Sequence, residues 1–231
     1  MREIRSRMLL GDETMARLSR TRIIVFGTGG VGSWCVEALV RTGARRLTVV
    51  DSDNVEESNC NRQLVATALT IGRPKVEVLR ERMLELNPEA EVTALQRRYT
   101  EETAPDFCLA DYDYVIDCID SVRDKASLII NTLKTEHTVL FSSMGAALRF
   151  DPTMVATAEF RKIEGDALAR ALRQHFKRWG TWPERRFRCV FSREPSSHNI
   201  IQADGNGSLM PVTATFGMTL ASLLLCDLRE A

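Results

Sequence analysis

The chain has 231 residues, and its 31 Lys and Arg balance its 31 Asp and Glu. This length suits one α/β domain with a small addition, and the zero net charge gives no general attraction to nucleic acid. The six cysteines include no C-x-x-C pair, which argues against a zinc site and a disulfide framework. We expect most of them to be buried small hydrophobic residues in a reducing cytosol.

No segment of the sequence has the pattern of a signal peptide or a membrane span. Residues 1–7 are charged, and no apolar stretch follows them. The longest apolar run, at about 214–226, is too short and too interrupted to cross a bilayer. We therefore expect a cytoplasmic protein with no membrane partner.

Six arginines lie within residues 1–22, ahead of the first apolar run. The simple interpretation is a solvated basic face. The alternative is that one of these arginines reaches a phosphate, across the interface of a dimer.

Spaced glycines follow the apolar run 22–26 and precede a helical pattern. Gly27 permits a tight turn, Gly29 and its neighbour Gly30 let the backbone approach a phosphate, and Gly32 lets the helix pack against the strand. The start of the helix presents free N–H groups and a partial positive charge to an anion. This stretch therefore predicts a nucleotide-binding βαβ unit.

Two carboxylates follow the second predicted strand, residues 47–50. Asp51 and Asp53 come about 19 residues after Gly32, close to the spacing of roughly 20 residues that is typical of ribose recognition. Either carboxylate could accept hydrogen bonds from the ribose hydroxyls, and the spacing does not choose between them.

Two basic residues follow these carboxylates and point to a triphosphate. The polar connection 54–63 places Arg62, an always-charged forked donor, beside the phosphates. Pro74 suits a helix start. Lys75 in that first turn opposes the helix dipole, so a lysine there is mildly unfavourable unless it binds an anion. Together Arg62 and Lys75 favour a triphosphate over a dinucleotide, which argues against an NAD-dependent dehydrogenase.

Carboxylates also end the predicted strand 112–120, at the edge where ligands bind in open α/β sheets. Asp120 is placed to hold Mg²⁺ between nucleotide phosphates. Asp117 is an equally good candidate for that role or for capping the turn. A small-residue turn, 144–147, follows the next predicted strand.

The second half of the chain contains a basic segment. Residues 161–188 hold nine Lys and Arg against three acids, with aromatic residues between them. Such a segment suits contact with RNA, although a merely solvated face is the commoner origin of a charge run. Gly180 and Pro183 interrupt it, so we expect a mobile loop within 179–188.

The periodicity predicts seven strands, at 22–26, 47–50, 92–95, 112–120, 138–142, 154–160 and 189–192. It predicts helical segments at 12–18, 33–42, 104–109, 121–134 and 163–179, one opening at 72–75 and one from 209 onward, with a turn at 204–208. The expected fold is α/β, a Rossmann-like doubly wound mixed sheet with a C-terminal strand and helix extension. Residues 1–231 form one domain, with a nucleotide-binding half at 1–150 and a mixed-sheet half at 151–231.

Taken together, these motifs resemble the ThiF/MoeB-type adenylating enzymes, the superfamily that includes the ubiquitin-activating enzymes. The resemblance rests on Gly27-x-Gly29-Gly30-x-Gly32, Asp51-x-Asp53, Asn59-x-Asn61-Arg62-Gln63, Gly72-x-Pro74-Lys75 and Asp117-x-x-Asp120-Ser121. Within the superfamily the chain is most similar to the tRNA threonylcarbamoyladenosine dehydratases. Arg2-x-x-Arg5, Asp151-Pro152-Thr153, Cys189-Val190-Phe191-Ser192 and 212–217 carry that similarity.

The resemblance implies ATP-dependent cyclisation of N6-threonylcarbamoyladenosine beside the tRNA anticodon. The threonyl carboxylate would attack the α-phosphate of ATP, and the ureido nitrogen would then displace AMP with net loss of water. The other activity of this fold is adenylation of the C-terminus of a ubiquitin-like sulfur carrier, which the absent zinc pairs and the basic segment disfavour.

The resemblance also implies roles for particular residues. The glycine turn, Asn59, Arg62 and Lys75 would bind ATP, and Asp120 would place Mg²⁺. Arg5, or Arg7 because the similarity there is short, would enter the site of a second subunit in a homodimer. A sulfur-transfer or accessory protein is a further candidate partner.

Cys189 raises the question of covalent catalysis, because relatives that form covalent intermediates use a cysteine in a crossover loop. Here Cys189 follows the basic segment at a predicted strand edge. Since the proposed attack is intramolecular and needs no enzyme thiol, we expect Cys189 to be structural.

Overall fold

The computed structural model describes residues 2–195 and 206–230. The strands are β1 (Arg22–Phe26), β2 (Arg46–Val50), β3 (Glu91–Leu95), β4 (Tyr114–Asp117), β5 (Val139–Ser143), β6 (Val155–Glu159) and β7 (Arg188–Ser192). The α-helices are α1 (Ile4–Arg20), α2 (Gly32–Thr42), α3 (Lys75–Leu86), α4 (Val122–Leu133), α5 (Ala167–Trp179) and α6 (Met210–Glu230). Short 3-10 turns lie at Glu57–Asn59, Ala104–Asp106, Leu109–Asp111, Pro152–Met154 and Phe160–Lys162.

All seven strands form one sheet in the order β3-β2-β1-β4-β5-β7-β6. Neighbouring strands are parallel except β6, which runs antiparallel to β7. The chain moves outward from β1 to β3 and then returns to place β4 on the other side of β1. A ligand crevice is expected at such a reversal of strand order, beyond the carboxyl ends of β1 and β4.

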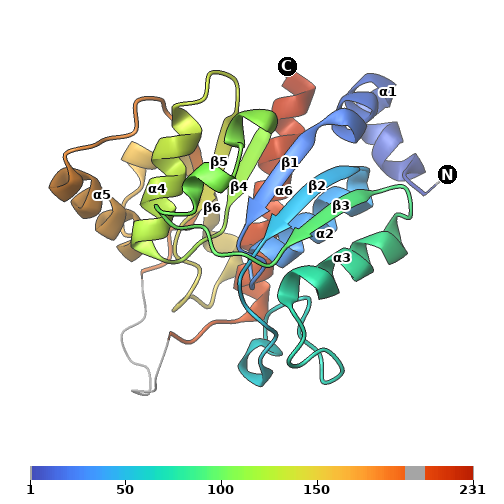
Figure 1. The fold of residues 1–231 in the computed structure, drawn as a ribbon, viewed down its shortest axis with the longest axis horizontal. Helices are drawn as coiled ribbons and strands as arrows, with labels where there is room; N and C mark the ends of the chain where they lie inside the picture. The colour runs from blue at the N-terminus through green and yellow to red at the C-terminus, as the bar shows by residue number, and fades with distance from the viewer. Residues whose placement is uncertain (1, 196–205, 231) are drawn as a thin grey trace.

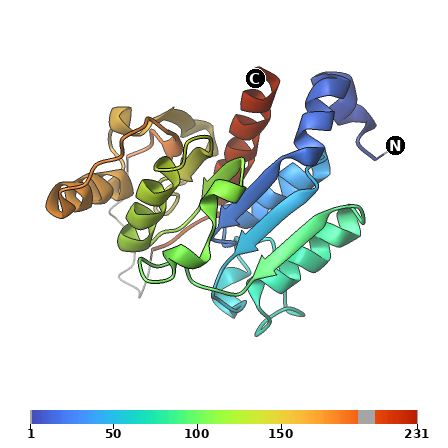
Figure 2. The ribbon, with the colours of Figure 1, turned by 45° about the horizontal axis from the view of Figure 1, so that its top comes forward.

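Helices cover both faces of the sheet, which is the doubly wound arrangement predicted from the sequence (Figure 1). Alternate residues of β1 face opposite sides: Ile23 and Val25 belong to the core shared with α2 and α6, whereas Ile24 and Phe26 belong to the core of the other face, where Phe26 packs against Tyr99 and Phe107. Figure 2 shows the C-terminal helix and the α4–α5 layer separated by the sheet. Because β1 is buried on both faces, it is apolar at each of these four positions.

Several expected elements differ in extent, and the helix expected at 12–18 is the longer α1, Ile4–Arg20. Residues 104–111 form two 3-10 turns in place of one short helix, and β4 ends at Asp117, before the carboxylate of Asp120. Helix α5 begins at Ala167 because Asp166 caps it and accepts a hydrogen bond from the Ala169 N–H at 2.8 Å. Of the predicted turn at 204–208, residues 204 and 205 lie outside the described residues.

The mixed-sheet half continues the same sheet as the nucleotide-binding half, because β7 pairs with β5. Helix α6 is long and apolar enough to cross a membrane by length and composition alone. In this fold Val212, Phe216, Leu220 and Leu224 of α6 are buried in the core against α2 and the sheet. The apolar character of α6 is therefore explained by core packing.

Candidate active site

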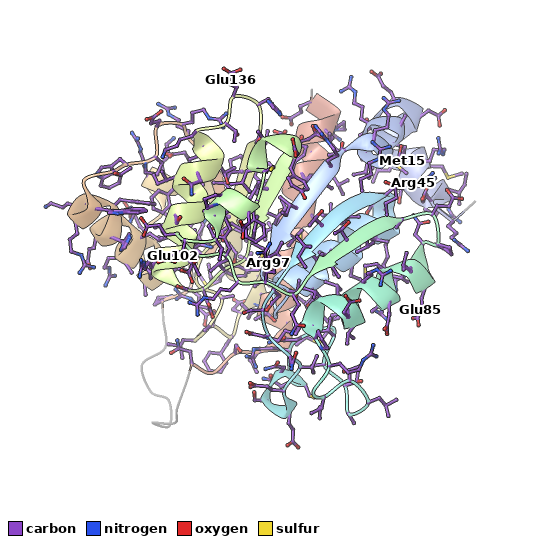
Figure 3. The ribbon with its side chains drawn as sticks, viewed as in Figure 1. Met15, Arg45, Glu85, Arg97, Glu102 and Glu136 are labelled. Atoms are coloured by element: carbon purple, nitrogen blue, oxygen red, sulfur yellow. The ribbon has the colours of Figure 1, made fainter. Side chains whose placement is uncertain are left out.

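A cavity of about 750 Å³ opens at the carboxyl ends of β1, β2, β4 and β5. Its walls come from the glycine turn after β1, the loops after β2, β3, β4 and β5, and the start of α5. Figure 3 shows Arg97 at this edge of the sheet, whereas Arg45 lies at the opposite edge. The cavity thus occupies the crevice expected from the strand order.

Two glycines allow the chain to pass between β1 and α2. Gly27 has φ +85°, and a Cβ there would lie 2.8 Å from the carbonyl oxygen of Cys118. A Cβ on Gly32 would lie 1.8 Å from the carbonyl oxygen of Gly27, so α2 could not start so close to β1 with a larger residue. Gly29 and Gly30 lie on the cavity wall between them.

The two candidate ribose carboxylates have different surroundings. One oxygen of half-buried Asp51 accepts hydrogen bonds from the backbone N–H of Thr28 at 2.6 Å and from its hydroxyl at 3.0 Å. The other oxygen accepts one from the N–H of Asp53 at 3.0 Å. Asp51 therefore ties the end of β2 to the glycine turn while it lines the cavity.

Asp53 is paired with Lys75. The Lys75 ammonium lies 2.9 Å from a carboxylate oxygen of Asp53, and the Lys75 side chain is only 8 % exposed. The bridge between Asn54 and Pro74 and the Lys75 N–H donated to the Asp53 carbonyl hold the two segments together. The fold thus fixes a nearly buried ammonium at the cavity wall.

The pair changes the acidity of Asp53. Partial burial raises the pKa of Asp53. The hydrogen bond and the positive charge of Lys75 lower it by a larger amount, so the net pKa lies below the ordinary 3.8. Because the pKa of Asp53 is lower in the folded state than in the unfolded state, its carboxylate stabilises the fold at pH values above the unfolded pKa. This contribution to the free energy of unfolding is lost as the pH falls through the folded pKa. The Asp53–Lys75 pair is therefore intact at neutral pH.

Arg62 reaches the same cavity from the segment after β2. The Trp34 indole donates to its carbonyl at 3.1 Å, and its guanidinium donates to the Ser58 carbonyl and the Asn61 side chain. The structure does not bring Asn59 to the cavity wall. Its amide oxygen accepts from the Glu56 N–H, so Asn59 caps the 3-10 turn that positions Arg62.

The two carboxylates after β4 have separate roles. Asp117 is fully buried, forms an ion pair with Lys125 at 2.8 Å, and accepts the N–H of Ile119 at 3.1 Å. It is therefore the turn cap. Asp120 is exposed and lines the cavity, and it has no ion pair among residues 2–195 and 206–230.

The structure does not place Arg5 or Arg7 in this cavity. Both lie on α1, at the end of the molecule where β1 begins (Figure 1). Arg7 pairs with Asp12, whereas Arg5 is exposed and has no ion pair within the described part of the chain. Neither arginine can serve this cavity from its own chain.

The basic segment 161–188 divides into structural and exposed parts. Arg185 donates to the carbonyls of Leu133, Glu136 and Thr138, and Arg173 donates to two further carbonyls. The Arg185 bonds tie residues 179–188 to the connection between α4 and β5, whereas the Arg173 bonds hold α5 against residues 160–163. Trp179 and Trp182 remain exposed, whereas Phe176 and Phe187 belong to the core.

Cys189 is completely buried within β7, and burial raises the pKa of its thiol well above the ordinary value. A buried neutral thiol cannot act as a nucleophile. We expect Cys189→Ala to keep turnover within about twofold of wild type and to lower the free energy of unfolding by ~1 kcal/mol. Product formation and urea denaturation measure the two effects. A folded variant without activity would contradict the structural role.

Several cavity residues were not predicted from the sequence. Arg97 and Arg98 follow β3, and their place directly after a strand was the available signal. Arg97 pairs with Asp106, and Arg98 pairs with Asp124. Arg149 also lines the cavity, just after the small-residue turn that follows β5.

This fold and this site define a nucleotide-binding α/β protein with a crevice that collects basic groups at a strand-order reversal. The sequence profile of the ThiF family matches residues 2–228. The chain belongs to the ThiF family.

Three similar proteins are tRNA threonylcarbamoyladenosine dehydratases. The tRNA threonylcarbamoyladenosine dehydratase of Bacillus subtilis is 40% identical over 190 residues, which cover 82% of this chain and 74% of the relative. The Haemophilus influenzae protein of that name is 37% identical over 238 residues, which cover 96% of this chain and 91% of the relative. The crystal structure of the Escherichia coli dehydratase TcdA in complex with ATP has a TM-score of 0.89 and 34% identity, covering 99% of this chain and 94% of TcdA.

Proposed function

We propose that this protein catalyses the ATP-dependent cyclisation of N6-threonylcarbamoyladenosine in tRNA. The observation that carries the proposal is the gathering of Arg62, Lys75 and Asp120 around one cavity beside the glycine turn. The dehydratases of B. subtilis and H. influenzae support the choice of substrate, and the ATP complex of E. coli TcdA supports the choice of nucleotide.

The first step transfers AMP to the substrate carboxylate. A carboxylate oxygen forms a bond to the α-phosphorus of ATP, and the bond from that phosphorus to pyrophosphate breaks. Negative charge builds on the phosphate oxygens during this displacement, and Arg62 and Lys75 are fixed positive groups that stabilise it. Because Lys75 is held by Asp53, its ammonium needs little reorganisation as the charge develops.

The second step closes the ring. The ureido nitrogen of the modification attacks the acyl carbon, gives up its proton to water, and releases AMP. The water lost from the modified adenosine is formally the water that converts ATP into AMP and pyrophosphate. No thiol is needed, since the nucleophile belongs to the substrate.

Asp51 is the better candidate for the ribose hydroxyls. It follows β2 directly, at the position that binds ribose in this class of fold, whereas Asp53 is already neutralised by Lys75. The ribose role of Asp51 also fits its fixed orientation against Thr28.

Asp120 fits a magnesium ion that bridges protein and nucleotide. Mg²⁺ is commonly held by one or two carboxylates together with substrate phosphates. Asp120 is an exposed carboxylate on the cavity wall, and the described residues contain no ready-made cluster of three or more metal ligands. The bound ion would offset phosphate charge beside Arg62.

A second copy of the chain would complete the site. Arg5 is exposed and cannot reach its own cavity, so it serves a phosphate only from a partner subunit. We include a cytoplasmic homodimer in the proposal, since both tRNA and ATP are available there. A sulfur-transfer or accessory protein stays a candidate further partner.

Release of AMP and pyrophosphate from ATP tests the proposed function. We expect stimulation by tRNA that carries the threonylcarbamoyl group, and none by the same tRNA without it. A carrier protein ending in Gly-Gly is the second comparison. Stimulation by that protein alone would assign the chain to carrier adenylation, and equal stimulation by both tRNAs would contradict the proposed substrate.

The exposed part of the basic segment is the candidate RNA surface. Arg186 is exposed, whereas the neighbouring Arg185 is engaged with backbone carbonyls. We expect Arg186→Ala to reduce the slope of log affinity for tRNA against log salt by about 1, without changing Tm. Arg185→Ala should instead lower Tm. An unchanged slope for Arg186→Ala would place the RNA surface elsewhere.

A further inference from the structure

Arg149 is a buried charged group in the wall of the cavity. It lies between β5 and β6 and is only 3 % exposed. Its Nε and Nη1 atoms are buried and have no hydrogen-bond partner in the part of the chain that the structure describes. Within residues 2–195 and 206–230 its guanidinium makes no ion pair.

Such an arrangement is costly unless a ligand completes it. Arginine stays charged at any physiological pH, and burying a charge without a partner is strongly unfavourable. Buried polar groups in native proteins are nearly always satisfied, so an orphan donor at a cavity wall indicates a missing partner. The partner of a forked, cationic donor is a carboxylate or a phosphate.

The other basic groups of the cavity already have partners among the described residues. Lys75 pairs with Asp53, and Arg97 and Arg98 pair with Asp106 and Asp124. Arg62 donates to the Ser58 carbonyl and to Asn61. Arg149 differs from all of them, because no acceptor of the described chain meets it.

The sheet order separates Arg149 from the ribose end of the cavity. Asp51 follows β2 on one side of β1, whereas the loop that carries Arg149 follows β5 on the other side, beyond β4. A nucleotide with its ribose at Asp51 and its phosphates at the glycine turn leaves the β5 side to the second substrate. The group that attacks the α-phosphate there is a carboxylate.

The residue before Arg149 has an unusual backbone conformation. Leu148 has φ +60°, which side chains rarely adopt, and its N–H donates to the Gly207 carbonyl at 2.9 Å. On the other side, the N–H groups of Phe150 and Asp151 donate to Glu194. Strain of this kind clusters at sites whose geometry matters for binding.

We propose that Arg149 binds the carboxylate of the threonylcarbamoyl group and presents it to the α-phosphate of ATP. This inference rests on the proposed function and names the residue that recognises the reacting group. One carboxylate oxygen is held by the guanidinium while the other attacks, which places the nucleophile and limits its motion. Arg149 is thereby a substrate-binding residue of the adenylation step.

Binding of an anticodon stem-loop RNA tests this role without turnover. One RNA carries the threonylcarbamoyl carboxylate, and the other carries its methyl ester. We expect the wild type to prefer the acid, and Arg149→Met to weaken binding of the acid about 30-fold or more while the ester and ATP change by no more than about twofold. Arg149→Lys, which keeps the charge without the fork, should recover part of the preference.

Two comparisons separate binding from a structural role. Arg46→Met removes an exposed arginine that pairs with Glu91 at the opposite edge of the sheet, and it should keep the preference for the acid. Arg149→Met should melt no lower than wild type, because it removes an unpaired buried charge. A lower Tm with an unchanged preference would assign Arg149 to structure and overturn the inference.

The remaining outcomes are also decisive. An equal loss of ATP and acid-RNA affinity in Arg149→Met would make Arg149 a phosphate ligand and overturn the inference. If the wild type forms the cyclic product and Arg149→Met keeps its preference for the acid, this inference alone fails. If the wild type forms no cyclic product, the proposed function fails and the inference falls with it.

Discussion

Replacement of Lys75 by Met is expected to lower the rate of pyrophosphate release with modified tRNA by about 10²- to 10³-fold. The ammonium is nearly buried at the cavity wall and is the counter-ion of Asp53. Its removal takes away a fixed positive charge and also leaves Asp53 unneutralised beside the phosphates. Single-turnover formation of the acyl-adenylate measures the effect on the chemical step directly.

Two further variants show whether the lost charge is responsible. Lys75→Met combined with Asp53→Asn removes both charges and should recover part of the rate, since the repulsive carboxylate is gone. Lys134→Met, which removes an exposed lysine at the end of α4, should keep the wild-type rate. A rate for Lys75→Met within tenfold of wild type would remove Lys75 from the phosphate site.

Replacement of Lys125 by Met should have the largest effect on stability, about 3–5 kcal/mol. Lys125 and Asp117 are both completely buried and lie 2.8 Å apart. The Lys125 ammonium also donates to the Ile119 carbonyl at 2.9 Å, and Asp117 accepts the hydroxyl of Ser142 at 2.7 Å. Without Lys125, a buried carboxylate loses its counter-ion, and urea denaturation should show a lower midpoint.

The second variant of this pair isolates the charge. Lys125→Met with Asp117→Asn leaves an uncharged amide whose oxygen can accept from the Ile119 N–H and whose NH2 group can donate to the Ser142 hydroxyl, so most of the lost stability should return. A loss below about 1 kcal/mol in Lys125→Met would show that the pair contributes little. The pair also holds the turn before Asp120, so an intact turn is required for any role of Asp120.

Local sequence patterns determined the strand, turn and helix that begin the nucleotide-binding half. Residues 22–26 form β1 as predicted, because residues 23–26 are buried on both faces of the sheet and are all apolar. Gly27 and Gly32 occupy a turn that admits no larger side chain. The steric requirement is local, and the sequence alone therefore shows it.

The cavity residues were partly predictable for the same reason. Arg62 and Lys75 stand at a loop and a helix start where a charge has no local advantage. The sequence assigned Asp120 to Mg²⁺ and left Asp117 open between that role and capping the turn. Only the packing of α4, which brings Lys125 onto Asp117, separates the buried turn cap from the exposed carboxylate.

By itself, the sequence determined the α/β class, the glycine turn and two of the basic groups that line the cavity, Arg62 and Lys75, because each follows from residue type and spacing along the chain. Only the tertiary structure decided that Asn59 caps a turn, that Arg185 donates to backbone carbonyls, and that Arg149 lies buried without a partner among the described residues. Burial and pairing depend on residues distant in the sequence, and their positions are fixed only when the sheet assembles.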